Sequence, residues 1–211
     1  MAGEPCCQRI MQERLKSISL SISKDLEEQG FAIVPGVLQP ETVEVLVTEI
    51  ENGLGRQARD TGYAMRHLVQ MVPAVRKVAQ GAAIRALVEP VLGPKAFVAR
   101  SLLLDKTPEA NWKVAWHQDL TVAVQARIDV PGFSAWSMKD GVVHVQPTDA
   151  VLERMLTVRL HLDDCDSANG PLQVIPKSHK AGRLNPCQIS AWRKREQPTI
   201  CAVSRGGALL M

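Results

Sequence analysis

The sequence lacks the features that place a protein in or across a membrane. No apolar run approaches the length of about 20 residues that a membrane-spanning helix needs. The first residues, Met1–Cys7, do not show the charged and then apolar layout of a signal peptide. These absences predict no membrane association, and they favour a cytoplasmic location.

A strong charge of either sign is also missing. The chain has 25 Lys and Arg against 22 Asp and Glu, a formal net charge of +3, and no segment carries a basic stripe. The sequence therefore predicts no nucleic-acid partner. No Cys-x-x-Cys motif occurs, which argues against a zinc ribbon or a thioredoxin-type site. Reduced and mostly buried thiols are the simpler interpretation of the five scattered cysteines: Cys6, Cys7, Cys165, Cys187 and Cys201.

What is present is typical of a globular domain with a substantial core, since 211 residues are 45% hydrophobic and 22% charged. The first part of the chain has helical periodicity. We expect helices over residues 10–26, Pro40–Glu51, Pro73–Gln80 and Ala82–Leu92, with a short strand at Phe31–Val34.

Strand patterns dominate after Lys95. Residues 121–155 contain scattered Pro and Gly without a clear period, which predicts a long insertion or lid. We expect strands at Ala96–Leu104, Val114–Asp119, Leu156–Leu162, Leu172–Ile175 and Gly206–Met211, with a turn at Asp166–Gly170. Helices followed by strands joined through hairpin turns predict an α+β fold with an all-β core.

The tripeptide His117-Gln118-Asp119 is the main chemical signal. Two side chains two residues apart on a strand point to the same face, so His117 and Asp119 can supply two ligands of a 2-His-1-carboxylate iron site. A lone His-x-Asp is more often structural. Its context includes a second polar face, formed by Thr157, Arg159 and His161, and a buried polar face needs partners or a ligand.

These segments together resemble one family. The carrying stretches are Arg100–Pro108, Trp116–Asp119, Thr157–Asp164 and Asn169–His179, the last reading Asn-Gly-Pro-Leu-Gln-Val-Ile-Pro-Lys-Ser-His. They are similar to the phytanoyl-CoA dioxygenase family of Fe(II)- and 2-oxoglutarate-dependent oxygenases. The resemblance implies N-terminal helices packed on a double-stranded β-helix, the jelly-roll or cupin-like core. It implies a helical extension over residues 1–24 and the oxygenase-like domain over residues 25–211.

The resemblance also implies roles for individual residues. His117 and Asp119 match the metal ligands, and Leu102 and Arg159 match positions near the co-substrate 2-oxoglutarate. Core packing of Leu102 and an ion pair of Arg159 with Asp163 or a neighbouring carboxylate are equally good interpretations. The implied partners are a small organic substrate and dioxygen, with oxidative decarboxylation of 2-oxoglutarate to succinate.

Two departures from the family pattern stand out. Lys177 occupies a position where the family usually has Gly, so we expect a strained turn there. In the family, a strand like Arg205–Met211 leads to a distal His ligand and then to an Arg or Lys for the co-substrate. Neither residue is in this sequence, and His144, His161 and His179 are weak substitutes. We therefore expect a domain that lacks its last strands, and whether this chain is an enzyme stays open.

Two alternatives remain beside the oxygenase. One is a non-catalytic or degenerate β-helix binding module, which would lack the distal His and the 2-oxoglutarate-binding Arg. The other is a cupin-type metal enzyme that uses no 2-oxoglutarate. The helical first third and the Asn169–His179 run argue against the cupin-type enzyme.

Overall fold

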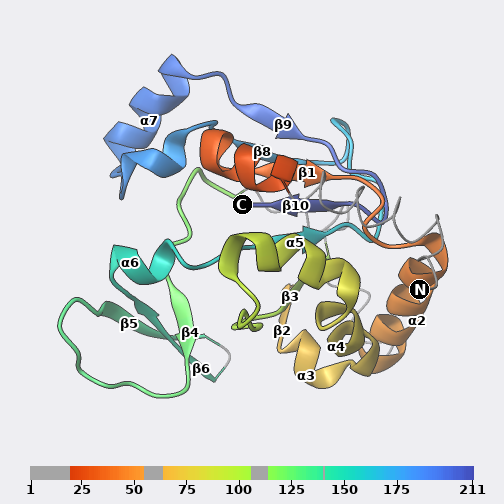
Figure 1. Ribbon diagram of the computed structural model, residues 1–211. Helices are drawn as coiled ribbons and strands as arrows, with labels where there is room; N and C mark the ends of the chain where they lie inside the picture. Colours follow the sequence, from red (N-terminus) through yellow and green to blue (C-terminus); the bar gives the residue numbers. More distant parts are fainter. Residues whose placement is uncertain (1–19, 55–63, 106–113, 140) are drawn as a thin grey trace, which may run out of the picture.

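The computed structural model describes residues 20–54, 64–105, 114–139 and 141–211. Helices and strands are mixed throughout, with the strands mostly short (Figure 1). A helix over residues 20–29 is followed by α2 (Pro40–Leu54), α3 (Leu68–Met71), α4 (Pro73–Ala79), α5 (Ala82–Leu92), α6 (Asp149–Leu152), the 3-10 helix η2 (Ser178–Ala181) and α7 (Pro186–Arg195). The strands are β1 (Ala32–Val34), β2 (Ala64–Arg66), β3 (Leu102–Leu104), β4 (Val122–Val124), β5 (Ser134–Lys139), β6 (Val142–Gln146), β7 (Val158–Leu160), β8 (Leu172–Val174), β9 (Thr199–Cys201) and β10 (Ala208–Leu210).

The predicted helices are largely confirmed. α5 has the expected bounds, α4 ends one residue early, and α2 runs three residues past the expected end. The first half of the helix expected over residues 10–26 lies outside the described residues, as does most of the predicted extension over residues 1–24. Among the described residues, no helix is both long and apolar enough to cross a membrane.

A central antiparallel sheet joins strands from both ends of the chain, in the order β1–β10–β7. Ala32 pairs with Leu210 on one edge of β10, and Leu209 pairs with Arg159 on the other. β10 enters this position through Gly206 and Gly207. A Cβ on Gly206 would lie 2.6 Å from the Leu38 carbonyl oxygen, so only glycine fits there.

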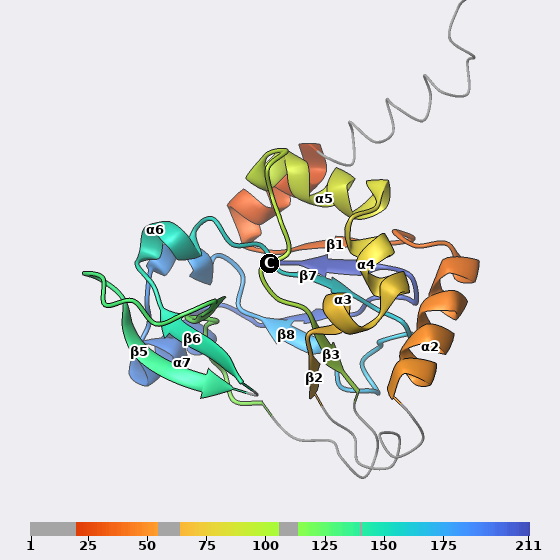
Figure 2. The same ribbon diagram turned by 90° about the horizontal axis from the view of Figure 1, so that it is seen from below.

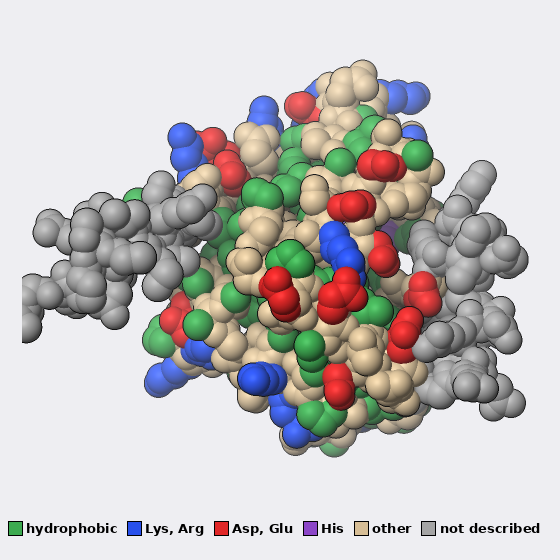
Figure 3. Space-filling view, turned by 90° about the vertical axis from the view of Figure 1, so that its right-hand side faces the viewer, with side chains coloured by type: hydrophobic (Ala, Val, Ile, Leu, Met, Phe, Trp, Pro, Cys, Tyr) green, Lys and Arg blue, Asp and Glu red, His purple; other side chains and the backbone are tan. Residues whose placement is uncertain are grey.

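Helices cover one face of the central sheet (Figure 2). Ala208 and Leu210 on β10 pack with Ile22 of the first helix and with Ile84 and Leu87 of α5. α2 adds Val43 and Leu46 to an adjoining cluster. The outer side of α2 is polar: Glu41, Glu44, Glu49 and Glu51 are exposed. Acidic side chains stand out on the side of the molecule where α2 lies (Figure 3).

The other face of the central sheet packs on the two-stranded sheet β8–β9. Leu209 on β10 is in one buried cluster with Cys201 of β9 and with Val203, and Leu172 and Val174 of β8 pack against it. β10 is therefore buried on both faces, since alternate side chains meet the helices and the second sheet. Arg159 lies on the inner face of β7, the face between the two facing sheets.

Three expectations about the strands are wrong. Only Leu102–Leu104 of the expected strand Ala96–Leu104 is a strand, and Phe97 is 86% exposed rather than buried. Val114–Asp119 is not a strand at all. β8 returns to pair with β9 and not with β7, because the chain crosses from one sheet to the other between Leu160 and Leu172.

The segment expected to be an irregular insertion contains a third sheet, in the order β4–β6–β5, followed by α6. The sheet lies apart from the two facing sheets (Figure 1). The pairing of β5 with β6 shifts between Ser134 and Ser137, and Ala135 in the shift has a φ of 49°. This bulge breaks the alternation of side chains and explains why the sequence shows no clear period here.

Candidate functional site

The structure brings the two predicted metal ligands together. The His117 Nε2 and Asp119 Oδ1 atoms are 3.7 Å apart, too far for a good hydrogen bond. A metal ion held at about 2.0–2.2 Å from an imidazole nitrogen and from a carboxylate oxygen fits between atoms at this separation. Both side chains face solvent, at 55% and 83% exposure.

The hydrogen bonding of His117 sets the tautomer that a metal site needs. Its Nδ1 atom lies 2.7 Å from the carbonyl oxygen of Ala115, which can only accept a hydrogen bond. Nδ1 therefore carries a proton, and Nε2 is the ring nitrogen on the side of Asp119. Metal-binding histidines commonly donate their second ring N–H to a carbonyl or carboxylate in this way.

No third ligand joins the pair within the described residues, which hold no group of three or more His, Cys, Asp and Glu side chains suited to a metal. All five histidines of the chain are described. His144 is buried in the third sheet with Nδ1 near its own strand, 3.1 Å from the Val142 carbonyl. The His179 Nε2 atom instead lies 3.1 Å from the carbonyl oxygen of Glu27, and its ring fills the space over Gly30.

Arg159 and His161 lie on the inner side of β7 and just beyond its end. His161 is buried, and its Nε2 atom has no hydrogen-bond partner among the described residues. Burial, and secondarily the Arg159 guanidinium, lowers the pKa of His161. Arg159 is half-buried, and no hydrogen bond or ion pair links it to another described residue, so the predicted ion pair with Asp163 does not form there. Asp164 instead accepts a hydrogen bond from the Arg205 backbone N–H, at 2.8 Å.

The cysteines near this inner face are free thiols. Burial raises the pKa of Cys201 to about 11. Arg159 lowers this pKa and Cys165 raises it, both by less than burial does. Burial also raises the pKa of Cys165. Both therefore stay protonated at neutral pH, in agreement with a structural role. Cys187, in contrast, is exposed on α7.

Leu102 is placed on β3, where it pairs with Arg66 of β2. The neighbouring Leu103 packs against the buried cluster of Ile50, Leu68 and Val72, and Leu102 is not part of that cluster. Simple core packing therefore describes Leu103 better than Leu102. The described contacts do not join Leu102 or Arg159 directly to the His117–Asp119 pair.

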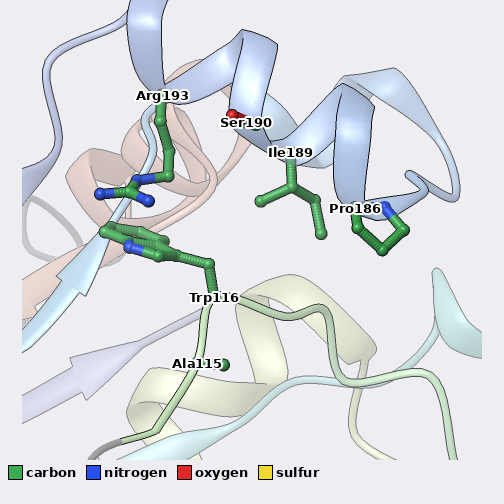
Figure 4. A pocket seen from close by; sticks show the side chains of 6 residues that line it. All are labelled: Ala115, Trp116, Pro186, Ile189, Ser190 and Arg193. Carbon is green, nitrogen blue, oxygen red and sulfur yellow. The ribbon is translucent and has the colours of Figure 1, made fainter.

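A shallow hollow of about 300 Å³ lies beside the segment of the predicted metal ligands, between Trp116 and α7 (Figure 4). The Arg193 guanidinium lies 4.9 Å from the centre of a Trp116 ring, a cation–π contact. Ile189 and Pro186 of α7 point into the same space. Sequence reasoning missed this helix, although the Asn185-Pro186-x-Gln188 spacing is a helix-start signal. Asn185 and Gln188 form a reciprocal capping box with two bonds of 2.9 Å.

Two turns expected from the sequence have the expected geometry. Lys177 adopts the left-handed conformation with φ 65°, the strain that its departure from glycine predicts. The Lys177 backbone N–H donates to the Gln29 carbonyl at 2.8 Å, which holds the turn against the first helix. The turn at Asp166–Gly170 is closed by hydrogen bonds between Asp166 and its neighbours Ala168 and Asn169.

Solved structures share this fold. The non-haem α-ketoglutarate-dependent carbocyclase SnoK from nogalamycin biosynthesis matches with a TM-score of 0.62 and 16% identity, over 90% of this chain and 72% of SnoK. EctD from S. alaskensis with bound Fe matches at 0.59 and 16%, over 89% of this chain and 66% of EctD. HygX from Streptomyces hygroscopicus with iron bound matches at 0.59 and 17%, over 90% and 75%. No curated protein matches the chain.

The fold is thus that of iron- and 2-oxoglutarate-dependent oxygenases of the non-haem class. The chain belongs to the phytanoyl-CoA dioxygenase (PhyH) family, which it matches over residues 26–211.

Proposed function

We propose that this chain carries the core of an Fe(II)- and 2-oxoglutarate-dependent oxygenase that hydroxylates a small organic substrate with dioxygen. The family membership and the 3.7 Å approach of His117 Nε2 to Asp119 Oδ1 carry this proposal. The two facing sheets would be the double-stranded β-helix of such enzymes. In the family, the metal and the co-substrate are held between facing sheets of this kind.

His117 and Asp119 would hold the iron ion. The hydrogen bond from His117 Nδ1 to the Ala115 carbonyl would orient the ring and leave Nε2 as the nitrogen that binds the metal. Bound iron together with 2-oxoglutarate would supply oxidising chemistry for an unreactive C–H bond. The protein's part is to fix the two ligands, exclude water and position the substrate.

Arg159 fits the role of a carboxylate partner for 2-oxoglutarate. A half-buried guanidinium that makes no ion pair with a described residue can form charge-assisted, two-pronged hydrogen bonds with an incoming carboxylate. The buried His161 Nε2 atom beside it also lacks a hydrogen-bond partner in the described part of the chain, and a bound acid would satisfy it. Leu102 would supply an apolar wall for the same co-substrate.

The third sheet and the hollow at Trp116 are our candidates for recognising the substrate. Trp136 of β5 stacks under Arg127, at 5.5 Å from guanidinium to ring centre, which gives a flat apolar surface with a positive edge. Two of the similar structures were solved with the natural products nogalamycin RO and hygromycin B. We infer a small molecule of comparable chemistry rather than a macromolecule.

Binding experiments on the 211-residue chain test the proposal. Anaerobic titration with Co(II), followed by 2-oxoglutarate, should show metal binding that His117→Ala abolishes. Arg159→Met should weaken 2-oxoglutarate binding without changing the affinity for Co(II), and the exposed Arg154→Met is the matched control. Wild-type affinity for Co(II) in His117→Ala would contradict the metal assignment. Equal 2-oxoglutarate binding in the two arginine variants would contradict the role of Arg159.

A second candidate is the non-catalytic binding module. The observation that favours it is the pair of ligands without a third among the five histidines. For this reason we expect the 211-residue chain by itself to form no succinate from 2-oxoglutarate. Succinate formation by the purified chain with Fe(II) would overturn that expectation and would leave the oxygenase as the better reading.

A further inference from the structure

The segment that carries the two metal ligands has no β-ladder to hold it. No backbone hydrogen bond joins residues 114–120 to another described residue. A strand of a sheet is fixed by such bonds, at every second residue on each edge. Something else must therefore set the position of His117 and Asp119.

The side chain of Gln118, between the two ligands, takes over this task. Its amide NH₂ donates to the carbonyl oxygen of Gly182 at 2.8 Å. Its amide oxygen accepts from the backbone N–H of Leu184 at 2.7 Å. One donor and one acceptor thus meet the backbone of a segment 64 residues away, as a neighbouring strand would do.

Trp116 and Gln118, on either side of His117, both contact α7 or the residues that lead into it, which we call the support. Trp116 lies under Arg193 of α7, and Gln118 binds Gly182 and Leu184, which lead into α7. His117 and Asp119 instead meet each other. Trp116 and Gln118 therefore contact the support, whereas His117 and Asp119, which alternate with them, form the ligand pair.

The support is itself fixed to the rest of the chain. Arg183, between the two residues that Gln118 binds, pairs with the Asp149 carboxylate of α6 and donates to the Pro147 carbonyl. Asn185 caps α7 through its reciprocal bonds with Gln188. Residues 182–185 thus connect α6 and Pro147, just before it, with α7 and with residues 114–120.

We propose that Gln118 is a positioning residue, which orients His117 and Asp119 for metal by fixing the segment between them to residues 182–184. The inference rests on the proposed function only for the identity of what the pair binds. Loss of the two amide hydrogen bonds leaves both ligands present but lets their separation vary. Metal affinity should then fall, because ligands held by outer hydrogen bonds bind metal more tightly than free ones.

The test compares Gln118→Met with Gln173→Met in the 211-residue chain. Methionine keeps the length and packing of glutamine but removes both amide bonds. Gln173 is an exposed glutamine of β8 and is the matched control. Co(II) titration should show about tenfold weaker binding or more for Gln118→Met, with an altered visible spectrum of the bound Co(II). The melting temperatures of the metal-free variants should agree within a few degrees.

Hydrogen exchange of the metal-free proteins gives a second, independent result. The Leu184 amide, which donates to the Gln118 side chain, should exchange faster in Gln118→Met and as in wild type in Gln173→Met. Unchanged exchange there, or wild-type Co(II) affinity in Gln118→Met, overturns the inference. If wild type binds no Co(II), the proposed function fails. Faster exchange in Gln118→Met would still show that the Gln118 side chain fixes its segment to residues 182–184.

Discussion

β10 and the ligand segment at residues 114–120 are held in opposite ways. Each residue of β10 is fully buried, with backbone ladders to β1 and β7, helices on one face and β8–β9 on the other. The ligand segment has no ladder to the described residues, and the two ligands proposed in it, His117 and Asp119, face solvent. Its position depends on a few side-chain contacts made by Trp116 and Gln118.

This difference separates stability from chemistry. Redundant burial makes the centre of the molecule resistant to local opening, whereas sites that must admit a ligand come from the less protected parts of a fold. A change at β10 should therefore cost stability of the whole chain. A change at Gln118 should cost mainly the geometry of the ligand pair.

The largest effect is expected from Leu209→Ala. Leu209 is fully buried between the two sheets, so its truncation should lower the free energy of unfolding by about 2–5 kcal/mol. Ile200→Ala on the partly exposed outer side of β9 is the control and should cost about 1 kcal/mol or less. Urea unfolding followed by circular dichroism measures both. Equal losses in the two variants would remove the contrast between a buried centre and its surroundings.

A smaller effect is expected at the turn that leads into β10. Gly206→Ala should lower the free energy of unfolding by about 2–4 kcal/mol, from a positive φ and a Cβ placed against the Leu38 carbonyl. Gly170→Ala has nearly the same φ but open space around the new Cβ, so about 1 kcal/mol of backbone strain alone is expected. Thermal and urea unfolding of both variants separate crowding from strain. If the two cost the same, the close approach of Gly206 to Leu38 does not matter.

The smallest effect concerns pH and the inner face of β7. Burial, and secondarily Arg159, lowers the pKa of His161 in the folded chain below its usual 6.5. The imidazole then binds a proton more readily in the unfolded chain than in the folded one. The free energy of unfolding is therefore undiminished by His161 above about pH 6.5 and falls as the pH drops below that value. His161→Gln should lose this part of the pH dependence. Urea midpoints between pH 8 and 5 measure it, and identical slopes in wild type and variant would show that His161 does not contribute.

Helices and the alternating strand were predictable because each rests on a local pattern. α5 follows from its apolar periodicity and from the Gly93-Pro94 stop, and β7 follows from alternation between Leu156 and Leu162. The pairing of the strands was less predictable. β8 joins β9 because both bury side chains against Leu209, a distant contact that the turn at Asp166–Gly170 does not reveal.

The candidate site divides in the same way. His117 and Asp119 were selected because a His and a carboxylate two positions apart can both bind one metal, and the structure places their side-chain atoms 3.7 Å apart. Their role as ligands stays a prediction. The expected strand around them was wrong, since an apolar run predicts a strand only where a neighbouring strand is available to bond it. The contacts of Gln118 with Gly182 and Leu184 leave no local pattern, because they join segments far apart in the sequence.

The pairing of β1 with β10 has a consequence for how the chain folds. Ala32 can pair with its backbone partner, Leu210, only after every residue between them has been synthesised. Contacts at such long separation make folding slow, since the closure entropy of a long loop must be overcome before the pairing stabilises anything. Until then β1 exposes an unpaired edge, which we expect to be the period when the nascent chain is most prone to aggregate.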